Sequence, residues 1–138
     1  MERGTRGAFW VYQLSSAGLF VGMFFENIHT QLLGFGAGLG LYLLGLGLLA
    51  AAVAAFCSPC QTGISTKGIY RFSRNPMYVA YDLIFLGCAT LAKSWLLLGL
   101  TACFILSGHW IIRAEERWCA ARFGEEYQAY RKRVRKYF

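Results

Sequence analysis

The stretch from Gln31 to Phe56, QLLGFGAGLGLYLLGLGLLAAAVAAF, runs for 26 residues without a charged side chain. A helix that crosses a bilayer needs about 20 consecutive apolar residues. This stretch is long enough to cross with some tilt, since each helical residue adds only about 1.5 Å. It therefore predicts a membrane-spanning helix.

The composition of the whole chain points the same way. The chain has 138 residues, of which 57% are hydrophobic and 15% are charged, against roughly 45–50% and about 25% in soluble domains. A compact domain of this length buries only about two-thirds of its unfolded surface. The composition therefore excludes a soluble globule, a disordered chain and a disulfide-stapled secreted module, and it indicates an integral membrane protein.

Three further apolar runs predict helices, at Phe9–Phe25, Met77–Ala92 and Trp95–Ile112. Only Lys93 and Ser94 separate the last two runs, so we expect a tight helical hairpin with Ser94 as the N-cap of its second helix. The predicted fold class is all-α. One domain, residues 1–138, forms an integral membrane bundle of about four transmembrane helices and ends in an amphipathic cytosolic helix.

Glycines recur along the run from residue 31 to residue 56. Gly34 with Gly38, and Gly36 with Gly40, are small-xxx-small pairs of the kind that let another helix approach closely. A nucleotide-binding loop is disfavoured, because no strand precedes the glycines and no polar phosphate ligand follows them. We therefore predict a helix-packing face.

Positive charge is distributed unevenly. The net charge is +7, and eight of the 14 Lys and Arg residues follow Ile112. Cations beside apolar segments indicate contact with the headgroups of the lipid bilayer and not with nucleic acid. The loop near residues 26–30 holds no Lys or Arg, whereas the loop from Cys57 to Pro76 and both chain ends are basic. The positive-inside rule then predicts a multi-pass protein with both termini cytosolic.

The basic tail carries one aromatic stripe at helical spacing, formed by Phe123, Tyr127, Tyr130, Val134 and Tyr137. This pattern predicts an amphipathic helix, which either lies in the headgroup layer or covers the end of the bundle. Gly124 is expected to separate it from the helix before.

The segment from Lys67 to Tyr78, KGIYRFSRNPMY, combines a loop with a helix start. Asn75 is a good N-cap, and Pro76 suits the first helical position. The free N–H groups and positive dipole end of such a helix can bind an anion. The simpler interpretation is a capped helix with an interfacial tyrosine at Tyr78.

Asp82 follows on the same helix face as Asn75 and Tyr78. A carboxylate inside a membrane span is costly, so it is expected to face a cavity or a partner. The alternatives are a functional role and a structural pairing with Arg71, Arg74 or a tyrosine hydroxyl.

A second group, His109, Arg113 and Glu116, shares one face of the last helix, with Glu115 adjacent. The simpler interpretation is a set of helix-surface ion pairs, Arg113 with Glu116 and Glu115 with Arg117. No second histidine lies at metal-ligand spacing, so no metal is predicted. The CxxC formed by Cys57 and Cys60 is interpreted as two reduced thiols at a helix end.

These motifs together resemble the isoprenylcysteine carboxyl methyltransferase and phospholipid methyltransferase family. The resemblance covers roughly residues 64–137. It rests on Gly68-Ile69-Tyr70, Arg74-Asn75-Pro76-Met77-Tyr78, Glu115-Glu116 and Phe123-Gly124-Glu125-Glu126-Tyr127, with Tyr130 and Val134. Asn75 stands where carboxyl methyltransferases commonly have His, whereas phospholipid methyltransferases tolerate Asn-Pro-Met-Tyr.

The resemblance implies methyl transfer from S-adenosylmethionine to a lipophilic acceptor at the membrane, with the cofactor held by residues 64–138. The cofactor-binding residues that it indicates are Ile64, Gly68, Tyr70, Arg74, Asn75, Pro76, Tyr78, Glu115 and Glu116. Arg113 resembles a basic residue placed near the acceptor. An amine acceptor must lose a proton, and Glu116, Asp82 and His109 are the candidate bases; a carboxylate acceptor needs no base.

Two other functions remain open on the sequence. The segment from Arg113 to Cys119, with Phe123 and Gly124, also looks somewhat like the carboxyl-terminal part of sterol-type membrane reductases, which use NADPH. A small non-catalytic membrane scaffold is the third hypothesis. The sequence leaves the acceptor (an isoprenylcysteine-type carboxylate, a phospholipid amine or a small hydrophobic thiol) and the oligomeric state undetermined.

Overall fold

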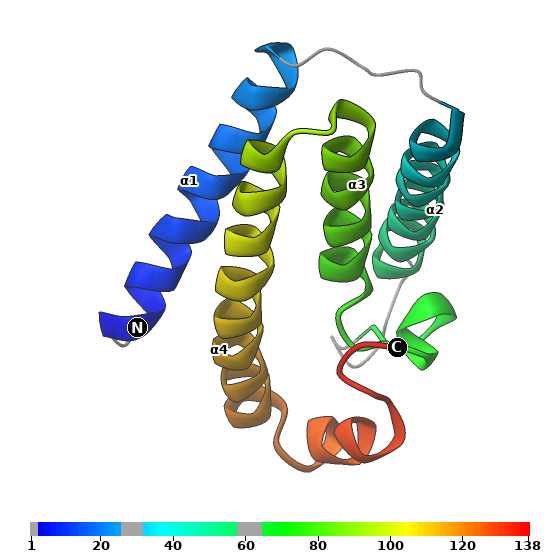
Figure 1. Ribbon diagram of the computed structural model, residues 1–138. Coiled ribbons are helices and arrows are strands. Elements are labelled where there is room, and N and C mark those ends of the chain that lie inside the picture. The colour runs from blue at the N-terminus through cyan, green and yellow to red at the C-terminus, as the bar shows by residue number, and fades with distance from the viewer. Residues whose placement is uncertain (1–2, 26–31, 58–64) are drawn as a thin grey trace.

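The computed structural model describes residues 3–25, 32–57 and 65–138. The helices are α1 (Arg3–Phe25), α2 (Leu32–Phe56), the short 3₁₀ helix η1 (Gly68–Arg71), α3 (Pro76–Ala92) and α4 (Trp95–Arg133). Figure 1 shows the four α-helices side by side in the order α1, α4, α3, α2, with both termini at the end of the bundle where α3 begins.

The outer faces of the bundle are apolar. Phe24, Trp95 and Leu14 are 89%, 86% and 68% exposed, which is unusual for a soluble monomer because water-exposed apolar patches are normally small. Three helices, α1, α2 and α4, are long and apolar enough to cross a membrane, and α3 is a shorter apolar helix of 17 residues. The prediction of an all-α integral membrane bundle is confirmed.

The core lies between α1, α3 and α4. The rings of Phe85 and Phe104 meet edge to face with centroids 4.9 Å apart, and Tyr12 stacks on Phe104 at 4.3 Å. Leu19 from α1 and Leu97 from α4 complete this cluster and are almost fully buried. Aromatic pairs of this geometry add to the free energy gained from burial, so they hold α1 against the hairpin of α3 and α4.

The glycines of α2 allow close packing against α3, but only on part of the predicted face. A Cβ atom on Gly38 or Gly45 would lie within about 3 Å of α3 backbone atoms, and one on Gly87 of α3 would lie 2.7 Å from the backbone nitrogen of Tyr42. A Cβ atom on Gly36 or Gly40 would meet nothing within 4 Å. The expected Gly36–Gly40 pair is therefore wrong, because those two residues point away from the contact.

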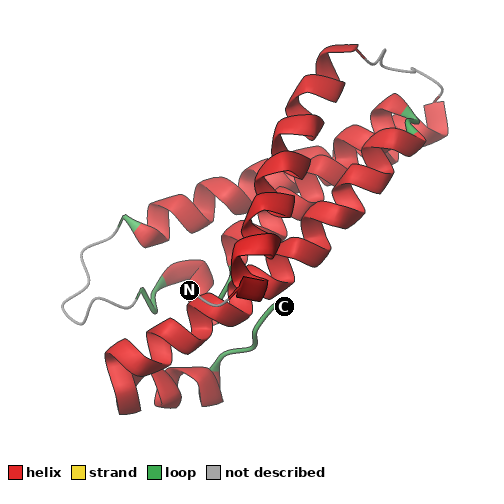
Figure 2. Ribbon diagram, turned by 90° about the vertical axis from the view of Figure 1, so that its left-hand side faces the viewer, coloured by secondary structure: helices red, strands yellow, loops and turns green. Residues whose placement is uncertain are grey.

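Two expected helix boundaries are confirmed. Ser94 is the N-cap of α4, and its side chain accepts a hydrogen bond from the Leu97 N–H group. Gly124 has a φ of 53° and interrupts α4 with a kink. Glycine adopts this left-handed backbone without the clash that a Cβ atom would cause. Figures 1 and 2 show the last part of α4 folded beneath the end of the bundle.

We predict that Gly87→Ala destabilises the bundle, because its new methyl group collides with the α2 backbone. Overpacking of this kind costs about 1–3 kcal/mol. The measurement is the midpoint of thermal unfolding in detergent. Gly40→Ala is the matched control, since its methyl group meets nothing and alanine favours a helix. Equal midpoints for the two variants would contradict the packing model.

Candidate functional site

The C-terminal tail is attached to the loop before α3. Ser73 and Arg135 form an isolated parallel bridge, and the Arg74 N–H group donates to the Arg135 carbonyl at 3.0 Å. The Asn75 side-chain amide donates to the Lys136 carbonyl at 3.1 Å. These bonds join segments about 60 residues apart, so the tail is part of this end of the fold.

Asn75 does not cap α3 with its side chain. It occupies the N-cap position, and Pro76 begins the helix as expected, but no side-chain capping bond forms. The amide is instead directed to the tail, and the Asn75 N–H group donates to Ser73 Oγ at 3.2 Å. The capping expectation was wrong because it considered only local acceptors and donors.

The aromatic stripe covers the end of the bundle. Tyr127 and Tyr130 are buried, and the Tyr130 hydroxyl donates to the Tyr70 carbonyl at 2.7 Å. The neighbouring cations Arg131, Lys132 and Arg133 are exposed. Of the two alternatives left open by the sequence, this part of the stripe is therefore a cover for the bundle end. The predicted helix is shorter than the stripe, because α4 ends at Arg133, and Val134 and Tyr137 lie beyond it.

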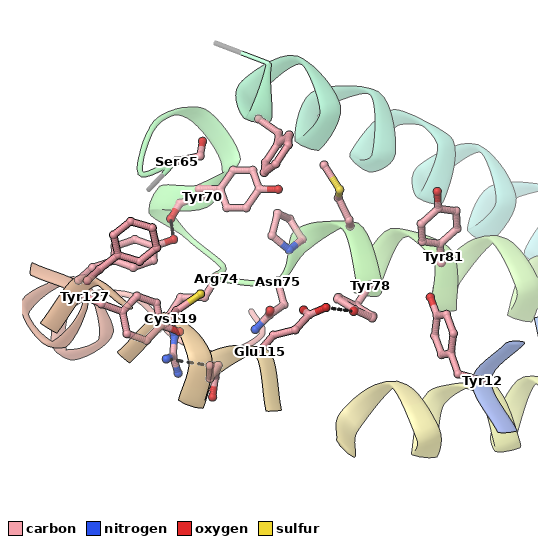
Figure 3. A pocket seen from close by; sticks show the side chains of 16 residues that line it. Tyr12, Ser65, Tyr70, Arg74, Asn75, Tyr78, Tyr81, Glu115, Cys119 and Tyr127 are labelled. Carbon is pink, nitrogen blue, oxygen red and sulfur yellow. Dashed lines mark hydrogen bonds and ion pairs between the residues drawn. The ribbon is translucent and has the colours of Figure 1, made fainter. Parts of the chain in front are cut away.

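Beneath this cover lies a cavity of about 460 Å³, which we call the aromatic cavity (Figure 3). It lies where η1 and the start of α3 meet the middle of α4 and the part of α4 that follows Gly124. Small-molecule sites typically enclose about 300–1,000 Å³, so the size suits a small organic ligand. Seven predicted site residues line it: Tyr70, Arg74, Asn75, Pro76, Tyr78, Glu115 and Glu116.

The two adjacent glutamates hold different partners. The Tyr78 hydroxyl donates to Glu115 Oε1 at 3.0 Å, which connects α3 to α4. Glu116 lies 3.1 Å from Arg74 Nη1 and 3.7 Å from Lys136 Nζ. Partial burial lowers the pKa of Lys136, while the Glu116 carboxylate acts in the opposite direction. The expected surface pair between Arg113 and Glu116 is wrong, since Glu116 faces inward to partners from other segments.

The ion pair of Arg74 and Glu116 is buried but incompletely satisfied. The two side chains are only 9% and 11% exposed. Arg74 Nε, Arg74 Nη1 and Glu116 Oε1 form no hydrogen bond with a described residue, although Nη1 and Oε1 lie 3.1 Å apart. Buried polar atoms are nearly always hydrogen-bonded in folded proteins. These three atoms therefore fit a site that receives a polar ligand.

Asp82 and His109 lie outside the aromatic cavity. They line a second cavity of about 370 Å³, the Asp82 cavity, which also includes Tyr78. His109 Nδ1 and the Tyr137 hydroxyl lie 2.8 Å apart. Asp82 makes no hydrogen bond or ion pair with any residue that the structure describes, so the expected pairing with Arg71 or Arg74 is absent there.

Arg113 lines a third cavity. Its guanidinium is 5.7 Å from the centroid of the Trp110 ring. The third cavity, of about 470 Å³, is also lined by Glu116 and four other cations, and we call it the basic cavity. The four residues predicted to be catalytic thus divide among three cavities, and only Glu116 reaches the aromatic one.

Among the predicted cofactor residues that the structure describes, Gly68 lines none of these three cavities. Gly68 has a φ of 57°, and a Cβ atom there would lie 3.0 Å from the Ala55 Cβ atom. Glycine is thus needed at this position to bring η1 close to α2. Ile64 and Cys60 lie outside the described residues.

The sequence did not reveal all of the lining residues. Tyr12 of α1, Phe56 of α2 and Tyr81 of α3 also line the aromatic cavity. Their aromatic side chains lie in apolar runs, where they are indistinguishable from lipid-facing or core residues. Cys119 and three stripe residues, Phe123, Tyr127 and Tyr130, line it too, and only the stripe residues gave a signal in the sequence.

Comparison with protein-family models gives one match: the phospholipid methyltransferase model aligns with residues 33–126. That range contains α3, the glutamate pair and most of the residues that line the aromatic cavity. Comparisons with curated proteins and with solved structures give no match.

We predict that Tyr130→Phe loosens the cover, because the Tyr70 carbonyl loses its donor. A buried group left without a partner costs about 1–3 kcal/mol. The expected results are a lower thermal midpoint in detergent and faster trypsin cleavage after Arg71 and Arg74. Tyr42→Phe is the control, since its hydroxyl makes no hydrogen bond to a described residue. Unchanged cleavage in Tyr130→Phe would contradict the covering role.

Proposed function

Because the chain belongs to the phospholipid methyltransferase family, we propose that it is an integral membrane enzyme that transfers a methyl group from S-adenosylmethionine to a lipophilic acceptor. One observation carries this proposal: the aromatic cavity is lined by the start of α3, with Asn75 and Tyr78, and by Glu115 and Glu116 of α4. These residues carry the sequence resemblance, and they come from separate elements.

The lining of the aromatic cavity suits each part of the donor. Glu116 Oε1 is buried without a hydrogen bond, and it suits the donor's ammonium group. Glu115 is available to ribose hydroxyls. The first turn of α3 offers N–H groups and a positive dipole end to the carboxylate. The rings of Tyr70 and Tyr78 offer π faces to a sulfonium.

The bound donor supplies a methyl group that is already activated by its positively charged sulfur. The chain's own residues then have to orient the reactants and exclude water, and these effects supply most of the rate in a displacement of this kind. The cover formed by Tyr127 and Tyr130 serves to exclude water from the aromatic cavity. Arg74 and Lys136 contact the Glu116 carboxylate and fix its orientation.

We infer that the acceptor approaches through the Asp82 cavity. Its lining includes Ile105 and Leu106, whose side chains are 38% and 66% exposed on the apolar outer surface. Tyr78 lines both this cavity and the aromatic cavity, so the two are neighbours. The unpaired Asp82 carboxylate attracts a cationic amine and repels a carboxylate. This favours a phospholipid amine over an isoprenylcysteine-type acid.

We further propose four membrane crossings with both termini in the cytosol. Both termini lie at one end of the bundle (Figure 1), as an even number of crossings requires. The α3 helix, with 17 residues, reaches the lower limit for a span. The loop before α3, the basic tail and the aromatic cavity would then all face the cytosol, which holds the methyl donor.

We predict that Glu116→Gln and Tyr78→Ala each raise the Kd for S-adenosylhomocysteine at least about tenfold, since Glu116 loses a hydrogen bond to a charged group, which contributes about 1.5–3 kcal/mol, and Tyr78→Ala removes a ring that lines the cavity. Calorimetry on the purified chain measures this. Glu125→Gln, which removes an exposed carboxylate, is the control. Binding of NADPH alone would favour a reductase, and binding of neither ligand would favour a scaffold.

We predict that Asp82→Asn slows methyl transfer to an amine lipid by about 10²-fold or more, the usual contribution of a general base, and leaves the affinity for S-adenosylhomocysteine unchanged. The assay supplies donor with a labelled methyl group to membranes and identifies the lipid that becomes labelled. Wild-type transfer rates in Asp82→Asn would eliminate Asp82 as the base. A labelled carboxyl ester would eliminate the amine acceptor.

A further inference from the structure

The basic cavity has a positive charge to which the proposed methyl transfer assigns no role. Besides Arg117, its lining holds four cations against one carboxylate, that of Glu116: Arg74, Arg113, Arg131 and Lys136. Glu116 pairs with Arg74 and Lys136. Gathering cations of one sign around a cavity is unfavourable unless an anion compensates for their repulsion.

The cations come from separate parts of the chain. Arg74 precedes α3, Arg113 lies in the middle of α4, Arg131 lies near its end, and Lys136 belongs to the tail. Arg74 is nine-tenths buried, and its Nε and Nη1 atoms lack a hydrogen-bond partner among the described residues. The fold thus places in the wall of this cavity a buried guanidinium that is ion-paired but incompletely hydrogen-bonded.

The cavity lies where an apolar helix face becomes basic. Trp110 lines it and is 60% exposed, and tryptophan is enriched at the membrane–water interface. Arg113, one turn later, lies over the Trp110 ring. From Ile112 onward, α4 carries the basic residues. The cavity therefore lies at the depth of the lipid headgroups, where phosphate groups are concentrated.

We propose that the basic cavity binds the phosphate group of an anionic lipid headgroup. Guanidinium groups match phosphate oxygens with paired N–H donors, and the cavity offers several from different directions. Arg74 and Glu116 line both this cavity and the aromatic cavity. The basic cavity shares no lining residue with the Asp82 cavity, so a lipid bound here is distinct from the acceptor.

The test measures lipid binding without any cofactor, so it succeeds or fails independently of methyl transfer. The delipidated full chain in detergent is titrated with short-chain phosphatidylglycerol, short-chain phosphatidylcholine or inorganic phosphate, and the thermal midpoint and binding heat are recorded. We expect saturable stabilisation by phosphatidylglycerol, about tenfold weaker binding of phosphatidylcholine, and no comparable effect of inorganic phosphate.

The variant pair locates the site. Arg113→Gln with Arg131→Gln should weaken phosphatidylglycerol binding at least about tenfold, because each nearby cation contributes about 1 kcal/mol to attraction of an anionic lipid. Arg122→Gln with Lys132→Gln removes two exposed charges from the same end of the molecule and should leave binding unchanged. Replacing Arg113 and Arg131 by Lys should restore most of the affinity if the charge-removed form is folded.

Three results would overturn the proposal. Equal weakening by the two double Gln variants indicates a diffuse surface attraction without a site. Equal affinity for phosphatidylglycerol and phosphatidylcholine removes the anionic requirement. Full stabilisation by millimolar inorganic phosphate assigns the cavity to a soluble anion and not to a lipid.

Discussion

The buried carboxylate of Glu116 connects three segments that are far apart in the sequence. It belongs to α4, and it pairs with Arg74 from the loop before α3 and with Lys136 from the tail. A buried charge is costly unless its partners are present. The loop and the tail must therefore both dock before this end of the bundle is stable, and the aromatic cavity exists only once they have docked.

The position of the surrounding cavities follows from the apolar environment of the membrane. Apolar helices supply a rigid frame, because each satisfies its own backbone hydrogen bonds, and polar side chains gather at the end where the helices leave that frame. Tyr78 lines the aromatic cavity and the Asp82 cavity, whereas Arg74 and Glu116 line the aromatic and basic cavities. One helix start and one ion pair thus separate the three cavities that we propose for the methyl donor, the acceptor and a headgroup anion.

The sequence by itself determined the fold class and the helix boundaries that depend on local chemistry. The charge-free run from residue 31 to residue 56 required a membrane helix, Ser94 capped α4, and Gly124 interrupted it. It also predicted Asn75, Tyr78 and Glu116 as site residues, and these three residues line one cavity. The predictions of fold class and helix boundaries succeeded because hydropathy, capping and left-handed backbone act over a few residues.

Only the tertiary structure decided which partner each polar group has. Asn75 bonds to the tail and not to its own helix, and Glu116 pairs with Arg74 and not with Arg113. The glycines of α2 likewise have equal spacing in the sequence, but Gly38 faces α3 and Gly40 does not. The physical reason is that these contacts join segments up to 61 residues apart, and helical periodicity specifies a face without specifying what lies opposite it.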